Sequence, residues 1–85
     1  MRIRKILIEG LAREKILKHG LQAGEVENAL LHGNPKITKE RYRRYVAITS
    51  HNRYITVIFE YANFNAEVIT AYKSSDWQIR KYQRK

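Results

Sequence analysis

The chain is rich in side chains that move protons or stabilise negative charge. Its 85 residues include seventeen lysines and arginines, eight aspartates and glutamates, three histidines and six tyrosines. Lysine and arginine can stabilise charge on a reacting phosphate, and histidine, glutamate or tyrosine can transfer protons. These groups suit RNA cleavage without a cofactor, because RNA carries its own nucleophile, the 2′-hydroxyl. The composition supplies these groups, but it does not show that they lie close together.

Other catalytic chemistries find little support in the residue types. The chain has no cysteine, which excludes disulfides and thiolate metal sites. His19, His32 and His51 stand alone and show no metal-binding spacing such as HxxxH. The four glycines are scattered and form no phosphate-binding loop. The sequence therefore predicts no metal site, no cofactor and no nucleotide-driven reaction.

Positive charge is the strongest feature of the composition. The formal net charge is +9, and the isoelectric point is about 10.1. This balance favours a polyanionic partner, with RNA or other nucleic acid ahead of an acidic protein. A soluble domain that is basic without a charged partner remains the third interpretation. The basic residues gather in the stretches 2–18, 36–53 and 73–85.

Length and hydropathy restrict the organisation of the chain. Domains usually hold about 100–150 residues and rarely fewer than about 50, so we expect one domain over residues 1–85. The longest apolar run, 6–8, is far too short to span a bilayer. No signal-peptide pattern follows the basic start of the chain. These features predict a cytoplasmic protein without a membrane partner.

Three helices are predicted. Residues 10–19 are good helix formers, and Gly20 stands where a C-cap glycine belongs. Residues 23–32 place three apolar side chains on one face, at positions i, i+3 and i+4. A short basic helix over 77–84 follows Asp76, which we expect to be its N-cap. This last helix is expected to dock through Trp77, Ile79 and Tyr82, with a frayed basic tail that ends at Lys85 as the alternative.

Strand signals fill the second half of the chain. Runs of β-branched and aromatic residues over 42–49, 53–61 and 66–72 are separated by turn residues at 50–52 and 63–65. This spacing predicts an antiparallel meander of three strands, with a weak fourth strand over 35–39. Residues 2–8 form either a strand or an extended entry segment. The expected fold class is therefore α+β, with two N-terminal helices on one face of a small antiparallel sheet and a short C-terminal helix.

Alternation along the strands assigns side chains to the two faces of this sheet. The face against the helices is expected to hold Val46, Ile48, Ile55, Val57, Phe59, Ile69 and Ala71. The other face is expected to hold Tyr45, Tyr54, Thr56, Thr70 and Tyr72. It is either an ordinary solvated surface or a platform for RNA or a partner, because tyrosine rings stack on unpaired bases.

Several strings in order resemble one family. Two are Lys18-His19-Gly20-Leu21 with Glu25–Leu30, and Arg44–Thr49 with Arg53–Phe59. Two more are Val68–Ser75 and Arg80-Lys81-Tyr82. Their order and spacing over residues 11–82 resemble the BrnT-like toxins of bacterial type II toxin–antitoxin systems.

This resemblance implies a RelE-like ribonuclease fold and metal-independent endoribonuclease activity that blocks translation. It also implies neutralisation by a BrnA-like antitoxin, a ribbon-helix-helix DNA-binding protein, in a heterotetramer. Tyr72 stands where the family has an arginine, and Gln22–Glu25 stands where the family usually reads TPEE. These departures motivate the alternative of a non-catalytic RNA- or protein-binding module with the same fold. A regulatory subunit that binds only a protein partner is a weaker third alternative.

The resemblance and the predicted tyrosine face of the sheet together indicate the candidate site residues. The candidate catalytic residues are Arg44, Arg53, Lys73, His19 and Tyr82. The candidate RNA-binding residues are Lys18, Arg43, Tyr45, Tyr54, Tyr72, Arg80 and Lys81. Each candidate catalytic residue also has a structural alternative. These are a helix cap for His19, solvated strand ends for Arg44 and Arg53, a salt bridge for Lys73 and packing for Tyr82. The catalytic interpretation requires Arg44, Arg53 and Lys73 to converge beside one tyrosine-lined surface.

Overall fold

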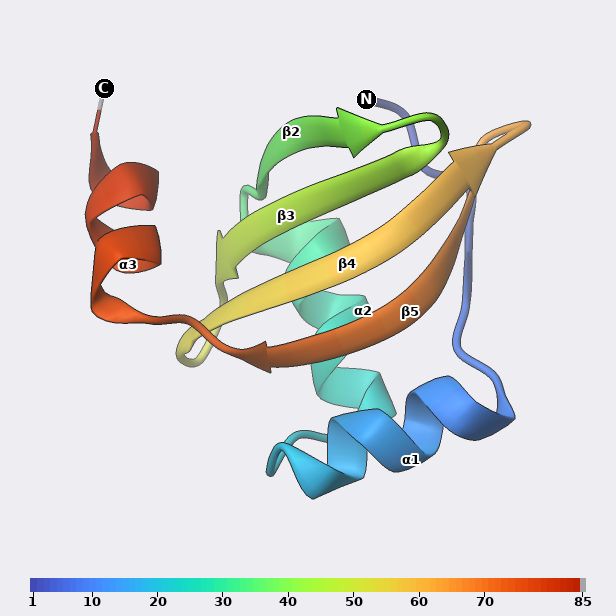
Figure 1. Ribbon diagram of the computed structural model, residues 1–85, viewed down its shortest axis with the longest axis horizontal. Helices are drawn as coiled ribbons and strands as arrows, with labels where there is room; N and C mark the ends of the chain where they lie inside the picture. Colours follow the sequence, from blue (N-terminus) through green and yellow to red (C-terminus); the bar gives the residue numbers. More distant parts are fainter. Residues whose placement is uncertain (85) are drawn as a thin grey trace.

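The computed structural model describes residues 1–84, so the predicted contribution of Lys85 to the basic tail lies outside the described residues. A five-stranded sheet carries α1 and α2 against one face, and α3 stands at one end of the sheet (Figure 1). The predicted α+β class is confirmed. In chain order the elements are β1 (Lys5–Leu7), α1 (Gly10–Lys18), α2 (Ala23–His32), β2 (Lys36–Arg41), β3 (Arg44–Ser50), β4 (Tyr54–Ala62), β5 (Asn65–Lys73) and α3 (Asp76–Gln83).

The sheet is larger than predicted and mixed in direction. Its strand order is β1-β5-β4-β3-β2, and strands β2 to β5 form the predicted antiparallel meander. The short β1 adds a fifth strand and pairs with β5 in parallel, with Lys5 opposite Asn65. The sequence could not predict this direction, because a three-residue strand carries no local signal of which neighbour it joins.

The two N-terminal helices form as predicted. Gly20 follows the end of α1 with φ at +79°, a left-handed conformation that glycine adopts without strain. Ile16 of α1 and Val26 of α2 are fully buried in the same core cluster as Phe59 of β4. The helices therefore cover one face of the sheet and hold the Gly20 turn against its end.

The predicted N-cap of α3 is wrong, and its predicted docking is confirmed for Tyr82 but wrong for Trp77. Ser75, and not Asp76, occupies the N-cap position, and the Ser75 backbone N–H donates to Gln78 Oε1 at 2.9 Å. Gln78 is the buried residue of the helix, at 4% exposure, whereas Trp77 is 58% exposed. Periodicity of apolar residues could not find this arrangement, because a polar side chain anchors the helix.

The predicted faces of β3 are also wrong. Residues directly opposite each other on paired strands share a face, and Ala47 lies opposite Val57 while Tyr45 lies opposite Phe59. Tyr45 therefore points toward the helices and Val46 and Ile48 point away from them. β3 is apolar on both faces, so its sequence does not indicate which face is turned toward the helices. A shift of one residue in the pairing moves every side chain to the opposite face.

A bulge between Ile58 and Phe59 changes the pairing with β5 in a similar way. Ile58 lies opposite Thr70, but Phe59 lies opposite Val68. Ile69 is therefore the extra residue of the bulge, and it is only half-buried. The prediction that Ile69 joins the core is wrong, and Val68 takes this place.

Candidate functional site at the end of the sheet

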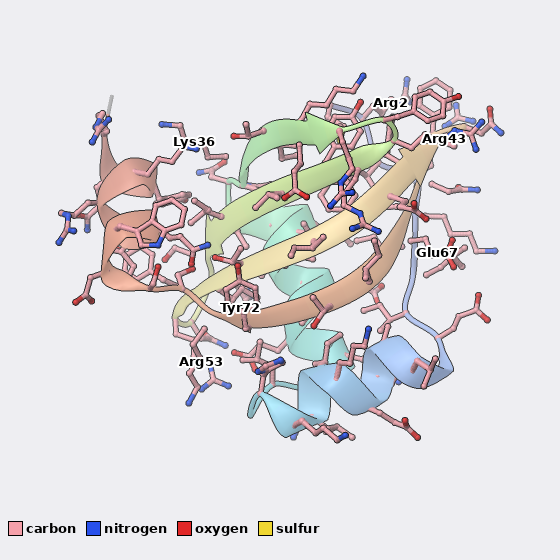
Figure 2. All side chains as sticks on the ribbon, in the orientation of Figure 1. Arg2, Lys36, Arg43, Arg53, Glu67 and Tyr72 are labelled. Atoms are coloured by element: carbon pink, nitrogen blue, oxygen red, sulfur yellow. The ribbon has the colours of Figure 1, made fainter. Side chains whose placement is uncertain are left out.

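Four of the predicted site residues meet where α1 ends beside the ends of β4 and β5. We call His19, Arg53, Tyr72 and Lys73 the basic corner. The His19 and Tyr72 ring centroids are 6.1 Å apart. Arg53 Nη2 donates to the Gly20 carbonyl oxygen at 2.9 Å, and Lys73 Nζ lies 3.7 Å from where a Cβ on Gly20 would stand. Figure 2 shows Arg53 and Tyr72 at this end of the sheet.

The Arg53 guanidinium is already engaged. Its Nε and Nη2 atoms donate to the two carboxylate oxygens of Glu25 at 2.7 and 2.9 Å. The hydrogen bond from Arg53 lowers the pKa of Glu25 below its ordinary value, and the same bond raises the pKa of Arg53. Glu25 is therefore a weak proton acceptor that stays ionised, and Arg53 fixes the Gly20 turn onto α2.

Lys73 is the cation of this corner that no carboxylate neutralises by direct contact. The ion pairs found within residues 1–84 join Arg41 to Glu40 and Arg53 to Glu25. Lys73 and His19 are both exposed at the surface, as is Lys18, which precedes His19. The corner therefore offers one lysine and an imidazole to an anionic ligand, and Lys18 lies next to His19 in the chain.

The sheet face turned away from α1 and α2 is the open face. It carries Val46, Ile48, Tyr54, Thr56, Ile58, Thr70 and Tyr72. Both of its tyrosines bind α3: the Tyr72 hydroxyl accepts from Gln78 Nε2 and the Tyr54 hydroxyl from Gln83 Nε2, each at 3.1 Å. Tyr45 is absent from this face, because it stacks on Phe59 with ring centroids 5.8 Å apart. The prediction that Tyr45 lines an exposed tyrosine surface is therefore wrong.

Arg43 and Arg44 lie at the other end of the sheet. Arg44 is directly opposite Glu60, and Arg43 sits in the β2–β3 turn with its guanidinium carbon 5.1 Å from the centre of the Tyr42 ring. Figure 2 shows Arg43 far along the sheet from Arg53. β3 has seven residues, which at about 3.3 Å each separates its ends by roughly 20 Å. The predicted convergence of Arg44 with Arg53 and Lys73 is therefore wrong. The catalytic interpretation in its predicted form fails with it, and any site at this end of the sheet must do without Arg44.

The C-terminal candidates belong to α3. The Tyr82 hydroxyl donates to the carbonyl oxygens of Gly33 and Asn34 at 3.0 and 3.1 Å, and its ring meets Tyr54 edge-on at 5.8 Å. These contacts fasten α3 to the end of α2 and occupy the Tyr82 proton. Arg80 is exposed and Lys81 half-exposed on the same helix.

Sequence reasoning missed two residues that shape these surfaces. The sequence gives Glu25 no role in the candidate site, yet its side chain orients Arg53. Lys36 Nζ donates to the Lys81 carbonyl oxygen at 3.0 Å and so caps the end of α3. Both partners are more than 25 positions away in the chain, so local patterns carry no signal for these pairs.

Two searches of the part of the chain that the structure describes concern metal-binding groups and long apolar helices. Residues 1–84 contain no group of three or more histidine, aspartate or glutamate side chains arranged to hold a metal ion. None of the described helices is long and apolar enough to cross a membrane.

Comparison with known proteins identifies a related fold. No family model and no curated protein sequence matches the chain. Among solved structures, the chain is similar to the Brucella abortus ribonuclease toxin BrnT, with a TM-score of 0.67 and 28% sequence identity. The match covers 85% of this chain and 97% of the Brucella chain. The resemblance seen in the sequence strings is therefore confirmed by the fold, and the chain is BrnT-like.

Proposed function

We propose that this chain is an endoribonuclease toxin that cleaves RNA at the basic corner without a metal ion. The observation that carries the proposal is the similarity to a ribonuclease toxin over 85% of the chain. The geometry adds a cation, Lys73, beside Gly20, and an imidazole, His19, beside the Tyr72 ring, at one exposed end of the sheet. Net charge of +9 supports an RNA substrate, since phosphate neutralisation drives such binding.

The proposed reaction uses the 2′-hydroxyl of RNA as nucleophile. His19 takes the 2′-hydroxyl proton while the 2′-oxygen bonds to the adjacent phosphorus, and Lys73 stabilises the negative charge of the phosphorane. The bond from phosphorus to the 5′-oxygen then breaks, and the leaving oxygen takes a proton from solvent. The products are a 2′,3′-cyclic phosphate and a 5′-hydroxyl. Tyr72 offers its ring for stacking, and Arg53 holds the turn that carries His19.

The proposal includes the partner and the cellular effect that the resemblance implies. Cleavage of messenger RNA in the cytoplasm blocks translation, and a BrnA-like ribbon-helix-helix antitoxin neutralises the toxin in a heterotetramer. An excess of basic over acidic side chains supports an acidic partner as well as RNA.

A binding module without catalysis is the second candidate. The Glu25 carboxylate already occupies two donors of Arg53, and Tyr72 provides no positive charge where the family has arginine. The same corner would then grip RNA and leave it intact. Binding would weaken steeply as salt rises, because each phosphate contact releases counterions.

RNA cleavage in EDTA separates the two functions. The wild-type protein is expected to cut a labelled messenger RNA and leave a cyclic phosphate, and Lys73→Ala and His19→Ala are each expected to reduce the rate by roughly 10²-fold or more. Lys5→Ala is the matched control, because Lys5 is an exposed lysine that flanks the opposite end of β5. Full cleavage by both corner variants would reject the site, and intact RNA with salt-sensitive binding would favour the binding module.

A further inference from the structure

A groove separates α3 from the strands β2 and β3 on the open face. Its volume is about 290 Å³, near the lower end of the roughly 300–1,000 Å³ typical of ligand pockets. Val46 and Ile48 of β3 lie along it with Glu40 of β2, and Trp77 and Lys81 of α3 stand beside them. The groove uses none of the residues of the basic corner, so it is a separate surface.

The lining of the groove suits an apolar side chain. Ile48 is 4% exposed, whereas Trp77 leaves 58% of its surface to solvent although it lies on a docked helix. A large exposed ring next to aliphatic side chains is a common feature of protein interaction sites. An aliphatic side chain would contact both, whereas a nucleic-acid base would find only one ring on which to stack.

The charges around the groove favour an acidic occupant. The elements β2 and α3 with the following residue carry Lys36, Lys39, Arg41, Arg80, Lys81 and Arg84, against Glu40 and Asp76. Lys36 is engaged with the end of α3, and Arg41 lies 3.6 Å from Glu40. Lys81 lines the groove, whereas Lys39 lies opposite Tyr45 and so extends from the edge strand on the other face of the sheet. Neither lysine makes an ion pair within residues 1–84.

The backbone of β2 offers a further means of recognition. β2 lies at an edge of the sheet and, within the described chain, pairs only with β3 (Figure 1). Its outer N–H and C=O groups can therefore pair with an extended peptide, which adds a strand to the sheet.

We propose that this groove binds an extended acidic peptide of a protein partner, which pairs with the edge of β2 and inserts one apolar side chain beside Trp77. If the proposed toxin function holds, the antitoxin supplies this peptide, and this assignment of the source rests on that proposed function. Side chains of an added strand alternate between the two faces of the sheet, so one carboxylate of the peptide contacts Lys81 in the groove and another contacts Lys39 on the other face of β2. The basic corner stays open.

A display library of random 12-residue peptides, selected on the full chain, tests the proposal. Selected peptides are expected to combine aspartate or glutamate with a leucine, isoleucine or phenylalanine. Trp77 is the single tryptophan of the chain, so a synthetic selected peptide is expected to shift its emission to shorter wavelength. Selection without acidic residues, or an unchanged Trp77 emission, would overturn the proposal.

Charge variants locate the binding. The double change Lys39→Glu with Lys81→Glu is expected to weaken the selected peptide more than tenfold, and the milder Lys39→Gln with Lys81→Gln at least threefold. The control Lys5→Glu with Lys15→Glu makes the same change of charge on exposed lysines elsewhere and is expected to stay within twofold. Equal losses of peptide affinity in the groove variant and the control variant would show that net charge alone determines binding, and would overturn the site.

Two further measurements separate this proposal from RNA binding in the groove and from the proposed toxin function. A 12-nucleotide uridine RNA that shifts Trp77 emission and depends on the same two lysines would assign the groove to RNA and reject a peptide site. RNA cleavage by the single variant Lys39→Gln is expected to equal that of the wild type, since Lys39 is not among the candidate RNA-binding residues. Absence of cleavage in every form, with peptide binding intact, would reject the toxin function and leave the docking surface standing.

Discussion

Replacement of Tyr82 by phenylalanine distinguishes a packing role from a proton-transfer role for this residue. The change removes the hydroxyl that donates to the Gly33 and Asn34 carbonyl oxygens and keeps the ring against Tyr54. The Gly33 oxygen keeps the Ser50 N–H as a donor at 3.4 Å and shares the Thr49 hydroxyl proton with the Ala29 oxygen, so it is not left without a partner. The expected loss is therefore that of one ordinary hydrogen bond, about 1 kcal/mol.

The assay combines thermal melting with RNA cleavage on the same preparation. For a domain of this size, about 1 kcal/mol lowers the melting temperature by roughly 4–8 °C. Tyr82→Phe is expected to show this decrease and to retain the cleavage rate of the wild type. Tyr42→Phe, whose side chain is exposed, is expected to change neither. An unchanged melting temperature together with loss of cleavage would refute the structural role and make the Tyr82 hydroxyl a proton donor.

Three further predictions concern the parts that hold the site. Gly33→Ala places a Cβ 2.6 Å from the Ala29 carbonyl oxygen and is expected to destabilise the fold by about 1–3 kcal/mol in urea melts. Gly24→Ala, whose Cβ would meet open space, is expected to stabilise the fold by up to about 1 kcal/mol. Equal changes in stability for Gly33→Ala and Gly24→Ala would contradict the packing argument. The pKa of Glu25 is lowered from its ordinary 4.5 by Arg53. The contribution of the Glu25 carboxylate to folding stability is therefore fully present above pH 4.5 and is lost as the pH falls through the lowered pKa. The stability difference between wild type and Glu25→Gln should therefore shrink below pH 4.5, and a constant difference down to pH 2 would argue against the ion pair. Gln78→Leu removes partners from Thr56 and Ser75 and should cost about 1–3 kcal/mol in thermal melts, whereas no loss would show that α3 docks without it.

Local features of the sequence determined the elements and the family resemblance. The second helix has the predicted bounds, 23–32, and Gly20 takes the predicted left-handed position. Helix periodicity and turn chemistry depend on residues within a few positions of one another, so one sequence contains this information. The BrnT-like strings also follow from order along the chain. His19, Tyr72 and Lys73 could be named as candidates for the same reason.

Contacts between distant segments determined how these candidates are arranged. The partner of Arg53 is Glu25, the neighbour of Arg44 is Glu60, and the two arginines stand at opposite ends of β3. The faces of β3 followed from its pairing register, because its own apolar residues fit either side. Local sequence determined which side chains were available, whereas strand pairing and long-range hydrogen bonds decided which of them meet, since these depend on the path of the whole chain.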